Sequence, residues 1–146
     1  MEDIQEKIYI IRGQRVMLDS DLAKLYSVDT KTFNRQVKRN IFRFPSDFMF
    51  KLSESEYKNL RCQNGTSRWT HGGRRSQPSV FTENGVAMLS SVLKSKSAVQ
   101  INISIMRIFT KLRSFQIFEK EIVNKIEQSN QKVIVFLKLF LKDWTI

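Results

Sequence analysis

The chain has 146 residues, of which 41% are hydrophobic, so it is long enough to bury one core, alone or as an oligomer. Its 25 Lys and Arg outnumber 14 Asp and Glu, and the formal net charge of +11 suits nucleic acid or an anionic membrane surface. One cysteine and one histidine exclude an internal disulfide and a Cys/His zinc cluster, and no apolar run reaches the length of a membrane span.

The positive charge is concentrated in residues 12–75. This stretch holds 14 Lys and Arg against 6 Asp and Glu, a net charge of +8 that leaves only +3 for the rest of the chain. The N-terminal sequence MEDIQEKIYI lacks the charged and apolar regions of a signal peptide. We therefore expect a soluble, cytoplasmic protein with no membrane partner.

Residues 7–18 predict a β-hairpin. The apolar runs IYII and VML flank a polar turn at Arg12, Gly13 and Gln14, which is the pattern of two short strands around a tight turn. We expect this hairpin to cover one end of the core.

Residues 18–43 predict a helix-turn-helix. Asp19, Ser20 and Asp21 can supply an N-cap oxygen and acidic charge, and apolar residues follow at helical spacing until the helix ends near Ser27. Asp29 and Thr30 then give a second start signal, before a helix that runs to Asn40.

The second of these helices, residues 30–40, has one apolar and one cationic face. Phe33 and Val37 lie four residues apart and are expected to pack inward. A charged face is usually only solvated, but no acid occurs between Lys31 and Phe42 to neutralise this one. Arg and Lys suit phosphates and guanine, and Thr or Asn suits adenine or phosphate, so the candidate DNA contacts here are Lys31, Thr32, Asn34, Arg35, Lys38, Arg39 and Arg43.

Several blocks of the sequence together resemble a known family. The segments DLAKLYSVDTKTFNRQVKRN, RFPSDFMFKL, GGRRSQPSVFTENGVAMLSSVL and NISIMRIF are similar to the phage and bacterial ORF-six-N domain, a relative of the KilA-N DNA-binding domains, over residues 8–113. The resemblance implies a DNA-binding module of phage-derived and mobile-element proteins. Two residues depart from the expected pattern: Ser27 replaces a turn glycine and Ser76 replaces an aromatic residue.

Residues 42–52 predict a strand with one buried face. Four phenylalanines fall on even-numbered positions, which is the period of a half-buried strand, and such aromatic density favours core over a base-stacking platform: Phe42, Phe44, Phe48 and Phe50. Ser53 then caps a short helix, with Glu56 at the spacing of a capping box.

Residues 61–77 are polar, rich in glycine and free of acids. Two interpretations stay open: an irregular surface loop, or a basic β-wing that follows the phosphate backbone and becomes ordered on binding. On the second interpretation the candidate DNA contacts are Arg68, Arg74 and Arg75.

Residues 80–93 predict a short strand followed by a helix. Val80 and Phe81 predict a strand, Thr82 caps a helix that extends to about residue 93, and Gly85 allows a neighbouring element to approach closely. Residues 98–112 predict a helix that is apolar on more than one face, and it is either the central core helix or part of an oligomer seam.

The last 32 residues contain no Gly or Pro and show a heptad-like seam with Ser129 near its middle. We expect a homodimer through this seam, although folding back onto the domain is the alternative. The seam residues are Phe115, Ile122, Ile126, Val133, Phe136 and Phe140. The expected domains are thus residues 1–113, for DNA binding, and 114–146, for oligomerisation.

Together these patterns predict an α+β protein with an N-terminal hairpin, a helix-turn-helix, short strands with a basic wing-like loop, and long C-terminal helices. We expect it to read duplex DNA in regulation, with no metal, cofactor or small-molecule substrate. One alternative is a protein-interaction module with incidental basic charge. The other is a metal-dependent nuclease, but the acids of the basic half are better explained as helix caps.

Overall fold

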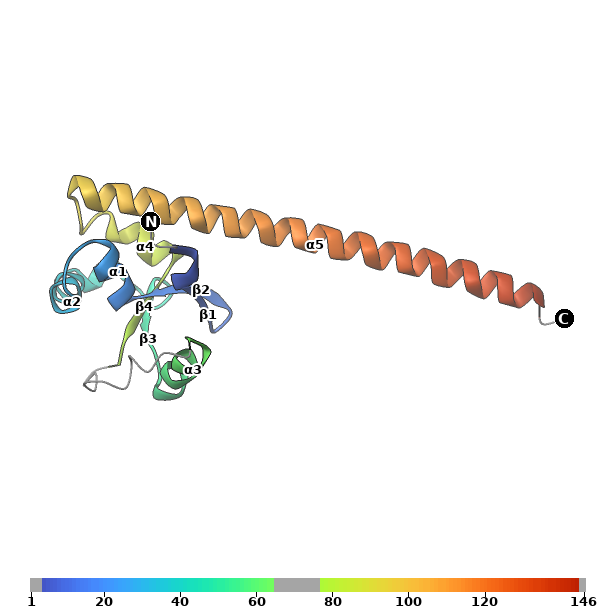
Figure 1. The fold of residues 1–146 in the computed structure, drawn as a ribbon, viewed down its shortest axis with the longest axis horizontal. Coiled ribbons are helices and arrows are strands. Elements are labelled where there is room, and N and C mark those ends of the chain that lie inside the picture. Colours follow the sequence, from blue (N-terminus) through green and yellow to red (C-terminus); the bar gives the residue numbers. More distant parts are fainter. Residues whose placement is uncertain (1–3, 65–76, 145–146) are drawn as a thin grey trace. The chain divides into compact units, whose positions relative to one another are not determined.

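A four-stranded antiparallel sheet lies at the centre of the first of two compact units, Met1–Ile108 and Phe109–Ile146. The structure is a computed structural model that describes residues 4–64 and 77–144. The strand order is β1-β2-β4-β3. The strands are β1 (Ile8–Ile11), β2 (Gln14–Leu18), β3 (Met49–Lys51) and β4 (Ser79–Thr82). The predicted α+β class is confirmed (Figure 1).

Helices and 3-10 turns precede, connect and follow the strands. The 3-10 turns are η1 (Ile4–Lys7) and η2 (Ile41–Arg43). The α-helices are α1 (Asp19–Leu25), α2 (Thr30–Arg39), α3 (Glu54–Asn64), α4 (Glu83–Leu89) and α5 (Lys96–Trp144). Along the chain η1 comes before β1, α1, α2, η2 and α3 lie between β2 and β4, and α4 and α5 follow β4.

The predicted N-terminal hairpin is present, and its turn is the two-residue pair Arg12 and Gly13. Both residues have positive φ, 54° and 73°, as a type I′ hairpin turn requires. The Arg12 guanidinium forms an ion pair with Glu56 at 2.9 Å and lies 4.4 Å from the centroid of the Phe50 ring. The turn is therefore joined to β3 and α3.

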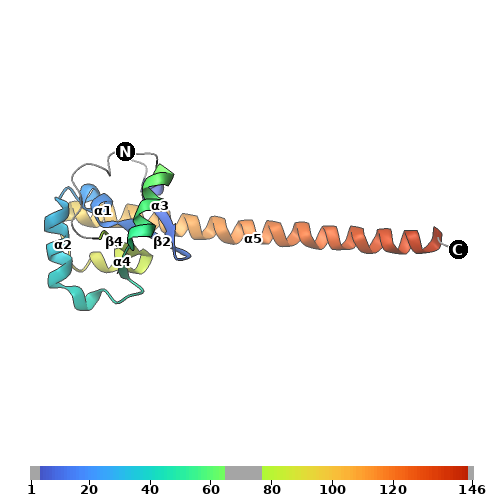
Figure 2. The ribbon, with the colours of Figure 1, turned by 90° about the horizontal axis from the view of Figure 1, so that it is seen from below.

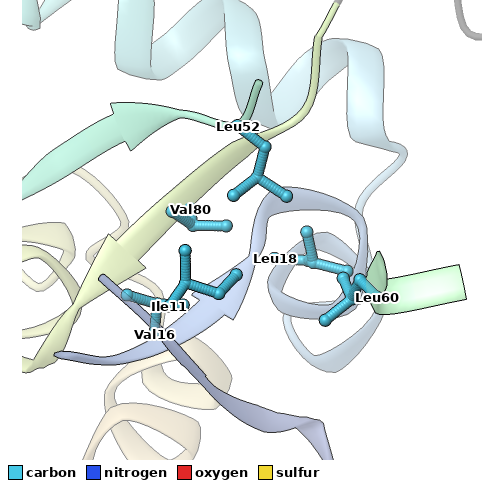
Figure 3. Close-up of a cluster of buried hydrophobic side chains, with 6 residues drawn as sticks. All are labelled: Ile11, Val16, Leu18, Leu52, Leu60 and Val80. Carbon is cyan, nitrogen blue, oxygen red and sulfur yellow. The ribbon is translucent and has the colours of Figure 1, made fainter. Parts of the chain in front are cut away.

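Helix α3 covers one face of the sheet. Four strand side chains, together with Leu52 directly after β3, form an apolar cluster with Leu60 of α3, drawn in Figure 3: Ile11, Val16, Leu18 and Val80. Figure 2, which looks from the side of α3, shows this helix in front of β2 and β4. The capping box that the sequence predicts is formed, since Ser53 N–H donates to Glu56 at 2.9 Å and Glu56 N–H donates to the Ser53 hydroxyl at 3.2 Å.

The opposite face of the sheet carries a core built on aromatic rings. Phe81 of β4 is fully buried and meets the ring of Phe33 from α2 at 5.5 Å and that of Phe44 at 5.6 Å, both edge to face. Because successive strand residues point to opposite faces, Phe81 points away from the α3 side, which its neighbour Val80 faces. Helix α2 is thus anchored on the face opposite α3.

Strand β4 leads into α4 through a tight junction. The Thr82 hydroxyl accepts from Gly85 N–H at 3.3 Å, which confirms the predicted cap, and donates to the Asp47 carbonyl at 2.8 Å. A Cβ on Gly85 would overlap the carbonyl group of Phe48, so the predicted close approach at this glycine is present.

The strand predicted for residues 42–52 is wrong over most of its length. Only Met49–Lys51 is a strand, and Ile41–Arg43 forms the 3-10 turn η2, in which Phe44 N–H donates to the Ile41 carbonyl at 3.0 Å. Phe44 is buried but Phe42 is 77% exposed. The even spacing of the phenylalanines imitates a strand, but the chain turns after Pro45, whose carbonyl accepts from Phe48 N–H at 2.8 Å and from Met49 N–H at 3.0 Å.

Helices α1 and α2 are joined by a turn in which Ser27 has a positive φ of 59°, at the position where the sequence suggested a glycine-like conformation. The preceding Tyr26 is buried, its hydroxyl donates to the Asn102 side-chain oxygen of α5, and burial raises its pKa above the ordinary value. The turn is thereby fixed to the part of α5 that lies in the first unit.

The second unit, Phe109–Ile146, is formed by the later part of α5. The sequence predicts separate helices before and after residue 113, but the structure joins them into one, because no Gly or Pro interrupts residues 96–144. The expected domain boundary at residue 113 therefore falls inside a helix.

Candidate nucleic-acid interface

Helix α2 begins at a well-formed cap. The Asp29 carboxylate accepts from Thr32 N–H at 2.8 Å, and hydrogen bonds from Thr32 lower the pKa of Asp29, with Arg35 and Lys31 contributing through their positive charge. Phe33 and Val37 are buried, as the sequence predicts. Because these two side chains fix which face points inward, the opposite face of α2 must point to solvent.

The outward face of α2 is uniformly cationic. Lys31, Arg35 and Lys38, at intervals of four and three residues, are exposed together with Arg39. No acid occurs between residues 30 and 46, and none of these four side chains forms an ion pair with a described residue. This set, Lys31, Arg35, Lys38 and Arg39, is called the basic face below.

Asn34 has a role inside the protein that the sequence does not reveal. Its amide donates to the Asp19 carboxylate at 3.0 Å, and Asp19 is 99% buried at the start of α1. The same carboxylate accepts from the backbone N–H groups of Ser20 at 2.7 Å and Ser79 at 3.3 Å. Asp19 thus connects α1, α2 and the start of β4, and the DNA contact expected for Asn34 stays a prediction.

The sequence suggested Asp19 only as a source of acidic charge or an N-cap oxygen. The N-cap of α1 is Leu18, without a side-chain hydrogen bond. No local sequence pattern could identify this buried carboxylate, because its partners Asn34 and Ser79 lie 15 and 60 residues away along the chain.

Two other expected DNA contacts, Thr32 and Arg43, are half-buried rather than exposed. The Thr32 N–H is used by the cap of α2. Arg43 lies in η2, with its guanidinium 5.1 Å from the centroid of the Phe42 ring and 3.4 Å from the Ser91 hydroxyl.

The basic loop predicted at residues 61–77 falls mostly outside the described residues, and so do Arg68, Arg74, Arg75 and Ser76. Residues 61–64 belong to α3, which ends at Asn64. The wing-like arrangement therefore stays a prediction.

The seam residues of the second unit are all exposed. The exposed fractions of Phe115, Ile122, Ile126, Val133, Phe136 and Phe140 run from 41 to 66%. Phe136 and Phe140, one helical turn apart, stack with ring centroids 6.4 Å apart. Helix α5 thus presents a line of apolar side chains to solvent.

Neither a metal site nor a membrane span is found in the part of the chain that the structure describes. Within residues 4–64 and 77–144, His, Cys, Asp and Glu side chains form no group of three or more that could hold a metal ion. None of the described helices combines the length and apolar character needed to cross a membrane.

In a comparison with known families, residues 6–92 match the ORF6N domain. The matched stretch contains the whole sheet, Asp19 and the basic face of α2. No curated protein and no solved structure gives a significant match.

Proposed function

This chain belongs to the ORF6N domain family, and from this premise we propose that it binds duplex DNA through the basic face of α2. The observation that carries the proposal is the pairing of a buried apolar face, Phe33 and Val37, with four exposed cations in a stretch, residues 30–46, that contains no acid. A helix anchored in this way presents its charges on a rigid support, and DNA phosphates are the abundant polyanion that such a surface attracts.

The proposed mode is that of a helix-turn-helix, with α2 as the recognition helix. In this mode Arg35 and Lys38, near the middle of the basic face, donate to guanine acceptors, while Lys31 and Arg39 toward its ends meet phosphates. Arg43, in η2 just after α2, is a further proposed contact. The contacts expected from Arg68, Arg74 and Arg75 lie outside the described residues and stay a prediction. The biological setting that fits this mode is regulation in a phage-derived or mobile-element system.

The test is binding of a fluorescent mixed-sequence duplex measured by anisotropy over a range of salt concentrations. Each neutralised phosphate contributes about 0.9 to the slope of log affinity against log salt, so substitution of Lys31 by Ala should lower that slope by about 1. On a selected binding sequence, Arg35→Ala should cost about 1 to 3 kcal/mol and relax specificity. A wild-type slope near zero refutes the proposal.

Lys58→Ala is the matched control for these substitutions. Lys58 is an exposed lysine of α3, on the sheet face opposite α2, so its loss removes the same charge from a surface that the proposal leaves free. Its affinity and salt slope should equal those of the wild type. If Lys58→Ala and Lys31→Ala lower the affinity and the salt slope equally, the binding depends on net charge alone and not on the basic face.

A binding role without catalysis is part of the proposal. Plasmid DNA incubated with the protein and magnesium should stay intact while the protein shifts it in a gel. Cleavage that depends on magnesium and is lost on substitution of an acid of the first unit would favour the nuclease alternative instead.

We further propose that the second unit pairs two copies of the chain into a homodimer. Its exposed seam, Phe115 to Phe140, is more apolar than a solvated helix normally is, and a second copy can cover it with identical side chains. A dimer brings two basic faces to one duplex, which raises affinity for a site with two halves. The same exposed seam also supports an assembly module whose basic charge is incidental, and the salt titration separates the two.

A further inference from the structure

Two large apolar side chains are exposed directly beyond the C-terminus of α2. Ile41 is 53% exposed and Phe42 is 77% exposed, the highest value among the exposed large apolar side chains of the described residues. Both belong to η2, and neither is needed to fill the core, because Phe44 occupies that role from the same segment. A single exposed apolar residue is ordinary. An adjacent pair beside a cationic helix indicates a binding partner that contacts the apolar side chains and the positive charge together.

The outward position of Phe42 is held by a defined turn. Arg43 N–H donates to the Asn40 carbonyl at 2.9 Å, and the Asn40 side chain donates to the Gln36 carbonyl of α2 at 2.9 Å. On the other side Phe44 is fixed against Phe81. Because both ends of the turn are anchored, little conformational entropy is lost when Phe42 meets a partner.

The charge around Phe42 limits what that partner can be. The Arg43 guanidinium lies 5.1 Å from its ring centroid, and the exposed Lys38 and Arg39 precede it in the last turn of α2. No acid occurs in residues 30–46. A partner must therefore be anionic and must also offer flat or apolar surface to an aromatic ring, and the stacked bases of a phosphate-linked duplex offer both.

We propose that Phe42, with Ile41 beside it, is an apolar wedge that enters a base step next to the DNA segment contacted by the basic face. The inference rests on the proposed function and adds a second kind of contact to it. Insertion of an apolar side chain partly unstacks the step, and it bends and unwinds the duplex there. The wedge thus makes binding depend on how easily the flanking step deforms.

The experiment compares the full-length wild type with Phe42→Ala on closed circular plasmid relaxed by topoisomerase I. A wedge unwinds the duplex, so wild-type protein should change the linking number of the recovered plasmid, and the variant should lose most of this change. Affinity for a linear mixed-sequence duplex should fall by roughly 5- to 100-fold, as expected for loss of an aromatic contact with a base. Phe42→Trp, which keeps a flat ring, should preserve the unwinding.

Ile10→Ala is the matched control, since Ile10 is 74% exposed and belongs to β1, which lies at the other end of the first unit from α2 (Figure 1). It should leave affinity and linking number unchanged. The thermal midpoint of Phe42→Ala should equal that of the wild type, because the side chain is mostly exposed.

The inference is overturned if Phe42→Ala binds and unwinds as the wild type does, or if the wild type binds without changing the linking number. Either result leaves the proposed DNA binding standing. A wild type that fails to bind duplex DNA refutes the proposed function, and the wedge with it. A lower molecular mass of Phe42→Ala in light scattering, with DNA binding and unwinding intact, assigns Phe42 to a contact between copies and likewise overturns the wedge.

Discussion

The hydrogen bond between Asn34 and Asp19 allows a direct test of how α2 is held in place. Asp19→Ala removes a carboxylate that is 99% buried and leaves the Asn34 amide and the N–H groups of Ser20 and Ser79 without this acceptor. Hydrogen bonds to charged groups contribute about 1.5 to 3 kcal/mol, and unsatisfied buried donors cost a similar amount. We expect the free energy of unfolding to fall by about 2 to 4 kcal/mol.

A double-mutant cycle separates the Asn34 bond from the other bonds of Asp19. Asn34→Ala alone should cost about 1 to 2 kcal/mol, because the carboxylate keeps its two backbone donors. The two substitutions together should cost less than their sum by about 1 to 2 kcal/mol, as residues in direct contact do. Urea denaturation followed by circular dichroism measures each of the four proteins.

Asp47→Ala is the control, since Asp47 is an exposed acid and its replacement should change stability by less than about 0.5 kcal/mol. Additive effects of Asp19→Ala and Asn34→Ala would refute the role of the bond. If Asn34→Ala lowers DNA affinity while stability is unchanged, the Asn34 side chain contacts DNA, as its place on the outward side of the predicted helix suggested.

Three further outcomes follow from other contacts. Gly85→Ala should lower the free energy of unfolding by about 1 to 3 kcal/mol in urea denaturation, because the added methyl group overlaps the Phe48 carbonyl; wild-type stability would contradict that close approach. The Arg12 side chain and then the Ser53 N–H lower the pKa of Glu56 from 4.5 to about 2, so its stabilisation is full above pH 4.5 and is lost as the pH falls toward 2. The thermal midpoints of wild type and Glu56→Gln should therefore differ at pH 7 and converge in acid, and a constant difference would disprove the pairing. Replacing both Val133 and Phe140 by Glu should reduce the mass in light scattering from dimer to monomer, whereas Lys138→Glu should not; a dimer that survives the double substitution places the interface elsewhere.

The elements with local signals are the ones that the sequence predicts well. The hairpin turn depends on Gly13, the start of α3 on Ser53 with Glu56, and the start of α4 on Thr82, and each signal spans at most four residues. The basic face of α2 belongs to the same class, because helical spacing alone decides which side chains point away from Phe33 and Val37.

The parts that the sequence does not predict depend on long-range packing. The alternating phenylalanines indicate a strand. Phe44 is nevertheless buried and Phe42 exposed, because only Phe44 packs against Phe81 of β4. Likewise Asp19 and Asn34 have ordinary local roles until tertiary structure brings them to 3.0 Å. Whether Arg68, Arg74 and Arg75 join the interface depends on residues outside the described region.

The order of the strands also determines when this protein can fold during its synthesis. Strand β2 pairs with β4 so that Val16 lies opposite Thr82, 66 residues later. The nascent chain can form its N-terminal hairpin early. The buried surface on which α2 packs is incomplete until Phe81 has left the ribosome. Helix α2, which depends on that ring for its anchorage, therefore reaches its final position only after more than half of the chain has been translated.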